Sequence, residues 1–298
     1  MVTQHSSMSS ASRFFIITLL CMLFPISLLG QMKRERVVTK RPVDDIFWSP
    51  NLVTQATVKN LGKGTLNVNI KHGFGFIDEG ADDLWGLDEQ VNVRLGVDYG
   101  ITDKISVGFG RQSDEKVFDL RTKINIIEQM SDDSVPLFIA WKGSVARTTD
   151  ENNLDFEDDL SYFTSVMFAR KFGDKLSLQV APMFTHFNTV IRGREGDELL
   201  DAENNHYAIG LGLSYKINKT FAINIDYLPV IGERTENTDN TFSVGLDVET
   251  GGHVFQMFFA STRWHTEDYA IARNESQFFK NEIRFGFNIN RVFGLGGN

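Results

Sequence analysis

The stretch QVNVRLGVDYGITDKISVGFGRQ, residues 90–112, decides the fold. Apolar side chains alternate with polar or small ones through both halves, and a short segment at 101–103 separates the halves. Successive side chains of a β-strand point to opposite faces, so each half predicts a strand with one apolar and one polar face. The stretch therefore predicts a β-hairpin that turns at residues 101–103.

The same alternation recurs along the chain from residue 66 onward. About twelve strands are predicted, at 66–75, 91–99, 105–110, 118–127, 135–146, on both sides of 172–175, at 206–216, 220–227, on both sides of 249–252, and at 281–293. A tilted strand of roughly 9–11 residues is long enough to cross a bilayer. The facing of the sixth and eleventh strands stays open; near residues 255–259 both faces are apolar.

The connections between these strands alternate in length. Tight links fall at 100–104, 172–175, 217–219 and 249–252, with 128–136 of middling length. Most of the other links are longer, at 78–89, 146–160, 188–205, 228–240 and 263–280, while 111–117 is shorter. Bacterial outer-membrane barrels have short turns at one end and long loops at the other, which a soluble sandwich with Greek-key connections does not require. The pattern predicts an all-β fold, a transmembrane antiparallel up-and-down β-barrel of about 12 strands over residues 64–298.

Composition agrees with a barrel that crosses a membrane. The 298 residues include 25 Gly and 25 Phe but only 6 Pro. The mean hydropathy of −0.18 is too low for a bundle of membrane helices. A membrane barrel tolerates this polarity because half of each strand faces water.

Two segments precede the predicted barrel. Residues 1–30 are predicted to be a signal peptide, because the apolar run 14–29 is shorter than the roughly 20 residues of a spanning helix. Cys21, the only cysteine, lies within it; an acylation site there is disfavoured by the large Leu20. Residues 31–63 are predicted to be an N-terminal periplasmic arm or plug, whose part from 45 to 63 could form a short helix, a cap or a plug. The predicted location is the cell outer membrane.

Charge limits the classes of partner. A net charge of −9 argues against nucleic acid, whose backbone is bound by basic patches. The six long loops carry 25 Asp and Glu against 9 Lys and Arg, which indicates either divalent cations that bridge to anionic lipid or a solvated surface. The second interpretation is favoured, because no flanking glycine turn accompanies the acidic runs. No metal or cofactor is expected; outer-membrane lipids and small solutes are the expected partners, and the oligomeric state stays open.

Charged residues on the polar faces of the strands are candidates to line a pore. They are Lys71, Arg94, Asp98, Arg121, Lys123, Lys142, Asp226, Asp247 and Arg284. Two interpretations compete: a mostly basic pore wall that selects solutes, and a network of internal ion pairs that closes the lumen. Eight strands leave room only for side chains and sixteen leave a water channel, so about twelve does not decide. The closed or plugged case is slightly favoured.

The leading functional hypothesis is a narrow channel or transporter for small solutes, anionic ones among them. The alternative is a structural barrel whose acidic outer loops bind a partner or lipid. An envelope lipid hydrolase would need a serine beside a histidine base. His186 has no serine close by in the sequence, and the expectation is that the protein is not an enzyme. The histidines of the predicted barrel are His72, His186, His206, His253 and His265.

Four runs carry a family resemblance. They are VKNLGKGTLNVNIKHGFG (58–75), WGLDEQVNVRLGVDYGITDKISVGFG (85–110), SVGLDVETGGHVFQMFF (243–259) and FGFNINRVF (285–293). Together they resemble an uncharacterised family of outer-membrane β-barrel proteins of Bacteroidetes-type bacteria, of unknown function. The resemblance implies a membrane barrel and its location and adds no chemistry. The chain departs from a common barrel feature, since five residues follow Phe293 where such barrels end on an aromatic residue.

Overall fold

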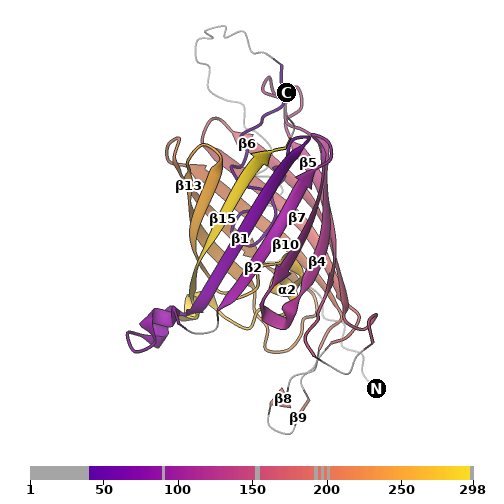
Figure 1. The fold of residues 1–298 in the computed structure, drawn as a ribbon, viewed down its shortest axis with the longest axis vertical. Helices are drawn as coiled ribbons and strands as arrows, with labels where there is room; N and C mark the ends of the chain where they lie inside the picture. Colours follow the sequence, from indigo (N-terminus) through magenta and orange to yellow (C-terminus); the bar gives the residue numbers. More distant parts are fainter. Residues whose placement is uncertain are drawn as a thin grey trace, which may run out of the picture. The chain divides into compact units, whose positions relative to one another are not determined.

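Antiparallel strands form one continuous sheet that closes on itself in the computed structural model (Figure 1). The structure describes residues 40–88, 91–151, 155–190, 194–195, 198–199 and 202–295, with only the backbone of 79, 194, 195, 198 and 199. The predicted signal peptide, residues 1–30, lies outside the described residues, as do 31–39 of the predicted arm.

Twelve strands go round the ring, as the sequence predicts. They are β1 (Thr65–Phe76), β2 (Asn92–Gly100), β3 (Ile105–Gln112), β4 (Phe118–Ile127), β5 (Phe138–Arg147), β6 (Leu160–Phe172), β7 (Leu176–Phe187), β10 (Asn205–Lys216), β11 (Phe221–Leu228), β13 (Thr241–Glu249), β14 (His253–Ala260) and β15 (Arg284–Gly294). The two-residue strand β12 (Val230–Ile231) extends one edge of β10, and β8 (Arg194–Glu195) pairs with β9 (Glu198–Leu199) in a separate hairpin.

The last strand lies beside the first, which completes the ring. Ile70 of β1 is opposite Ile289 of β15, in a register that runs from Thr65 to Gly73 before it shifts. On the other side of the sheet, β10 pairs with β11. Each of the twelve strands therefore has a hydrogen-bonded neighbour on both sides. The predicted barrel requires its last strand, 281–293, to lie beside its first, 66–75, and this closure is confirmed.

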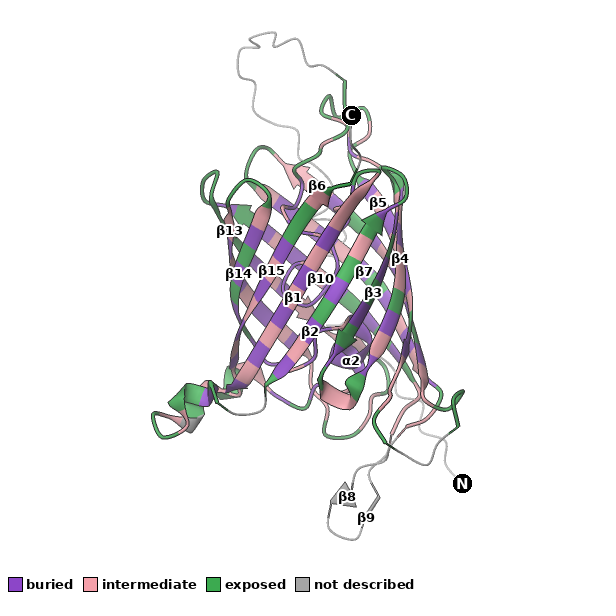
Figure 2. Ribbon diagram, in the orientation of Figure 1, coloured by how far each residue is buried: buried purple, intermediate pink, exposed green. Residues whose placement is uncertain are grey.

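Buried and exposed residues alternate along the strands (Figure 2). On β2, Leu95 and Val97 are exposed on the outer face, while Asn92 and Arg94 point inward and are buried. On β15, Asn288 and Asn290 are buried inside the ring. The outer surface is thus apolar and the inner surface polar, the reverse of a soluble protein and the arrangement of a barrel in lipid.

The two strands whose facing the sequence leaves open have apolar residues on both faces. On β6, Tyr162 and Phe168 lie outside, and Phe163 and Met167 are buried inside. On β14, Phe258 is buried inside between outward Met257 and Phe259. Alternation of polarity fails on these strands because part of the interior is dry.

Short helices occupy several long loops. They are η1 (Ile77–Glu79), η2 (Leu84–Gly86), η3 (Asp114–Lys116), α2 (Glu267–Ala272) and η4 (Phe278–Lys280). Strand β15 begins three residues later than predicted because η4 precedes it and Asn281 is left-handed, with φ of 70°. No helix within the described ranges is long and apolar enough to span a membrane.

A charge on the outer face of β2 tests the membrane assignment. Val97 lies opposite the apolar residues Val68 and Phe109 and is exposed. We expect Val97→Lys to lower the free energy of unfolding in lipid vesicles by about 2–4 kcal/mol, because lysine must then lose its hydration in hydrocarbon. Urea titration followed by tryptophan fluorescence measures the change. Val97→Leu is the control; equal effects of the two variants would contradict a lipid-facing position.

Candidate functional site: the occupied lumen

Residues 46–61, which we call the lumen segment, lie inside the ring. The chain enters near Asp45, whose side chain bonds to Lys171 and Lys216 at the strand ends beside the tight turns. It reverses between Pro50 and Thr57, whose amide donates to the Pro50 carbonyl, 2.9 Å. Asn60 then donates to the Lys104 carbonyl, 2.8 Å, in a tight turn. The segment is a loop inserted from the tight-turn end, and no helix forms in its described residues.

Polar side chains of the wall hold the tip of this loop. Asp226 on β11 accepts hydrogen bonds from the amides of Thr54, 2.8 Å, and Gln55, 3.1 Å. Gln179 on β7 accepts from the Val58 amide, 3.1 Å, and donates to the Ala56 carbonyl, 2.7 Å. These bonds pair backbone groups that are buried without a strand partner.

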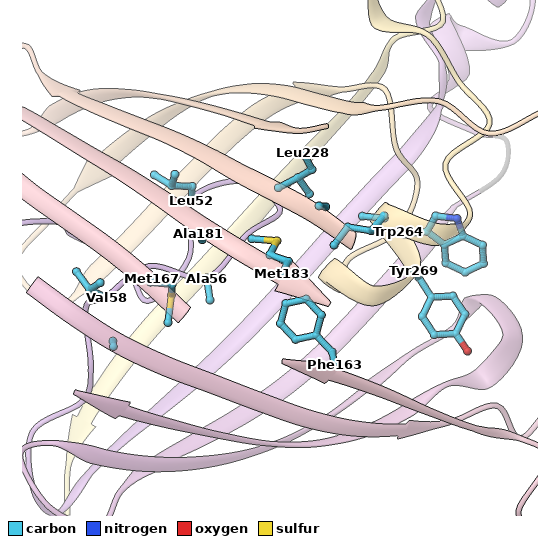
Figure 3. Packing of buried hydrophobic residues seen from close by; sticks show 14 of the residues in the cluster. Leu52, Ala56, Val58, Phe163, Met167, Ala181, Met183, Leu228, Trp264 and Tyr269 are labelled. Atoms are coloured by element: carbon cyan, nitrogen blue, oxygen red, sulfur yellow. The ribbon is translucent and has the colours of Figure 1, made fainter. Parts of the chain in front are cut away.

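Apolar contacts complete the seat of the lumen segment. Leu52, Ala56 and Val58 lie among apolar side chains of the wall, shown in Figure 3 with Met167 of β6 and Ala181 of β7. Met167 is one of the inward apolar residues that interrupt the alternation of polar and apolar side chains on β6. They form a dry patch against the lumen segment, whereas the opposite wall is charged.

A second segment fills the lumen from the long-loop end. Helix α2, in the loop between β14 and β15, is wholly buried. Glu267 pairs with Lys142 on β5, 2.6 Å, and accepts from the Ala56 amide, 2.9 Å. Tyr269 shares a 2.8 Å hydrogen bond with Thr148. The two inserted segments therefore meet inside the barrel, and Glu267 joins them.

Four charged residues form a network on the wall between β2 and β4. Arg94 pairs with Asp119, and Arg121 pairs with both Asp119, 2.6 Å, and Asp98, 2.7 Å. Asp119 is almost fully buried. Buried charges need such partners, because desolvation costs more than an isolated charge can recover.

Inward glycines on β3 make room for this network. A Cβ on Gly108 would lie 2.0 Å from the Asp98 carboxylate, and one on Gly110 would lie 2.1 Å from the Arg94 guanidinium. Both glycines face the lumen between the charged strands β2 and β4. Glycine leaves space for the network at these two positions, since any side chain there would displace an ion pair.

The other predicted pore-lining residues also point inward. Lys71 donates to the His265 carbonyl, 3.2 Å, and Lys123 donates to the Thr57 carbonyl, 3.1 Å. Asp247 accepts from Gln256, 2.6 Å. Arg284 lies over the Phe76 ring, 3.7 Å from its centroid. The structure brings several of the nine to the two inserted segments, and Arg284 lines a hollow with Arg263 and Trp264 of the α2 loop. That any of the nine line a conducting path stays a prediction.

Three residues at the centre of the lumen are absent from the predicted set. Asp119 is an acidic residue at an inward position of β4, so alternation alone could have identified it. Gln179 is an uncharged inward residue of β7. Glu267 belongs to a long loop, and no local pattern indicates that this loop folds back between the strands.

Two small polar cavities lie among the described residues of the lumen. They have volumes of about 40 Å³, beside Asp98 and Lys123, and about 20 Å³, beside Lys71 and Glu267. They hold only a few water molecules, since one needs about 10–15 Å³. Larger hollows of about 230 and 440 Å³ lie at the long-loop end around Arg263, Trp264 and Arg273. Among the described residues, the lumen segment and the α2 loop occupy much of the lumen.

The histidines make no catalytic pairing with serine in the described ranges. His206 contacts Thr235, 3.2 Å, His186 contacts Asn205, 2.8 Å, and His265 contacts the Asn92 carbonyl, 2.8 Å. His72 stacks on Phe287 on the outer face.

Of the residues that the structure describes, no group of three or more His, Cys, Asp and Glu is arranged to hold a metal ion.

Asp45 is fixed by two lysines at the tight-turn end. Partial burial would raise the pKa of its carboxyl, but hydrogen bonds from Lys171 and Lys216, reinforced by their charges, lower it to about 2. A carboxylate with a lowered pKa stabilises the folded state above its unfolded pKa, near 3.8, and this contribution disappears as the pH falls toward 2.

Removing the shared carboxylate of the ion-pair network should destabilise the barrel. Asp119→Asn leaves Arg94 and Arg121 with one fewer buried partner, so we expect the free energy of unfolding to fall by about 3–5 kcal/mol. Asp150→Asn, in the exposed pair with Lys116, is the matched control and should cost much less, because a solvent-exposed ion pair contributes little to stability. Urea unfolding in vesicles measures both; similar small losses would show that the network contributes little.

The Asp45 bridge predicts a defined pH dependence. The difference in urea midpoint between the parent protein and Asp45→Asn should be constant above about pH 4 and shrink toward zero as the pH approaches 2. Asp44→Asn, at the exposed adjacent residue, should show no such change. A difference that persists unchanged at pH 2 would refute the stabilising bridge.

The chain is similar to several solved structures of outer-membrane proteins. The KdgM porin is 10% identical over 77% of this chain and 99% of its own, with a TM-score of 0.45. The Acinetobacter baumannii outer membrane protein Omp33 is 8% identical over 78% and 99%, with a TM-score of 0.39. The translocator domain of autotransporter NalP from Neisseria meningitidis is 10% identical over 79% and 90%, with a TM-score of 0.37.

No curated protein matches the chain in sequence. One family does: its description is "Membrane bound beta barrel domain (DUF5777)", and it matches residues 47–293. The match includes most of the lumen segment as well as all twelve strands of the ring. The chain belongs to this family of membrane-bound β-barrels.

Proposed function

We propose that the protein is an outer-membrane channel for small solutes, closed in this conformation by the lumen segment and the α2 loop. The observation that carries the proposal is the way the lumen segment is held. It forms no strand of the ring, and many of its contacts are single hydrogen bonds to wall side chains, such as Asp226 and Gln179. Water can replace such bonds at a small net cost in free energy.

The wall behind the inserted segments suits anions. Lys71, Lys123 and Lys142 point into the lumen and bond to inserted residues rather than to acidic residues of the wall. If the segments withdrew, these ammonium groups would face water and raise the local concentration of anions. Twelve strands enclose a space between that of side-chain-filled barrels and that of porins, so a narrow passage is expected.

An engineered disulfide bond can fix the lumen segment to the wall, because the only natural cysteine of the chain is Cys21. Thr54 and Ser243 have hydroxyl oxygens 3.1 Å apart, so cysteines there are close enough for a disulfide with little movement. We expect Thr54→Cys/Ser243→Cys to show no openings in planar bilayers when oxidised and parent-like openings after reduction. Each single variant, under the same redox treatment, is the control.

Deleting residues 46–61 should give the opposite result, a larger and more persistent conductance with a preference for anions. Lys123→Gln in that deletion should reduce the preference, because Lys123 then faces the open lumen. Gel mobility before and after heating checks that each variant folds. Absence of conductance in both the parent and the deletion, with both folded, would refute the channel.

The filled lumen itself favours a second candidate, a barrel that carries binding loops and never conducts. The acidic loop 146–160 at the long-loop end is one such surface. Its deletion would then abolish binding to a partner or lipid while leaving membrane insertion intact. Conductance of the deletion 46–61 decides between the two candidates.

A further inference from the structure

One carboxylate occupies the basic part of the lumen wall. Glu267 is almost fully buried, and its two oxygens lie 2.7 and 2.6 Å from the Lys142 ammonium. The first oxygen also accepts the Ala56 amide, 2.9 Å. The carboxylate belongs to a six-residue helix on a loop and to no strand of the ring.

The charge around this carboxylate is unbalanced without the loop. The wall lining the adjacent 20 Å³ cavity contributes one carboxylate, Asp119, and four cations, Lys71, Arg94, Arg121 and Lys142. The loop adds Glu267 and Asp268. Without the loop, the lining would carry a net charge of about +3, or about +2 when Asp98, the partner of Arg121, is included. A negatively charged group is therefore stabilised there.

The ligands of Glu267 are those that proteins offer to a free carboxylate. An ammonium and a backbone N–H make charge-assisted hydrogen bonds, which are roughly twice as strong as neutral ones. A solute bearing a carboxylate presents the same two oxygens at the same spacing. It would lose no more hydration than Glu267 does.

We propose that Lys142, Lys71 and the Ala56 amide form a binding site for carboxylate-bearing solutes, which Glu267 occupies in the closed state. The proposal rests on the proposed channel and names its substrate class. A solute that displaces Glu267 removes the hydrogen bond that joins the α2 loop to the lumen segment. Binding of the transported class thus removes this link, so the α2 loop no longer holds the lumen segment in place.

Exposure of the lumen segment tests this without any current measurement. The reporter is a single cysteine, Thr54→Cys, in a chain whose only other cysteine, Cys21, is replaced by serine; Thr54 is buried in the closed state. The rate of thiol labelling in detergent reports release. The probes are propionate, which copies the glutamate side chain, its neutral analogue propionamide, and chloride at the same ionic strength.

Propionate should accelerate labelling of the reporter about tenfold in a saturable manner, and propionamide and chloride should not. The reporter in the Glu267→Gln variant should be labelled about tenfold faster even without a probe. In the Lys142→Gln variant, propionate should not accelerate labelling. Glu275→Gln, an exposed position on the same loop, should behave like the parent. Heat-dependent gel mobility confirms that each variant is folded.

Two results would overturn the site. If Glu267→Gln does not change the labelling rate, the Glu267 carboxylate does not hold the lumen segment. If that variant is labelled fast but propionate has no effect on the parent protein, Glu267 has a structural role only and its site does not bind solutes. Either result leaves the conductance experiment unaffected. Conversely, a barrel that never conducts could still show the propionate response, so the two proposals fail separately.

Discussion

Closure of the sheet is the constraint on which the rest of this structure depends. Hydrocarbon offers no hydrogen bonds, so an unpaired strand edge within a bilayer would cost several kcal/mol for each exposed backbone group. The pairing of β1 with β15 and of β10 with β11 removes both edges. Once the ring is closed, one face of each strand must be apolar for lipid, and the other face surrounds a lumen.

The lumen imposes the second requirement. Charged side chains cannot face lipid, so they gather inside, and inside they need partners. The arginines on β2 and β4 find them in Asp98 and Asp119 of the same wall. The lysines find theirs in the inserted segments, as Lys142 does in Glu267. The basic residues of the wall and the inserted segments that cover them are therefore electrostatically complementary.

The two inserted segments differ in what holds them. The lumen segment has an apolar side against Met167 and Ala181 and a polar side against Asp226 and Gln179. The α2 loop is held by a buried ion pair and by the hydrogen bond between Tyr269 and Thr148. Because Glu267 of the α2 loop accepts the Ala56 amide of the lumen segment, movement of either segment removes a buried partner from the other.

The sequence by itself determined the barrel, its strand number and the direction in which most charged residues point. The period of two along residues 90–112 and the alternation of tight and long connections are local properties, and local properties suffice to place a strand and its faces. They also explain why Arg94 and Arg121 could be assigned to the interior before any contact was known. Only the tertiary structure decided what fills the interior. The contacts of Glu267 with Lys142 and of Asp226 with Thr54 join residues 125 and 172 positions apart. No periodic pattern records such contacts, because loops 46–61 and 263–280 have no strand register to fix their partners. The facing of β6 and β14 could not be decided from the sequence for the same reason, since their inward apolar residues pack against segments that are distant in the chain.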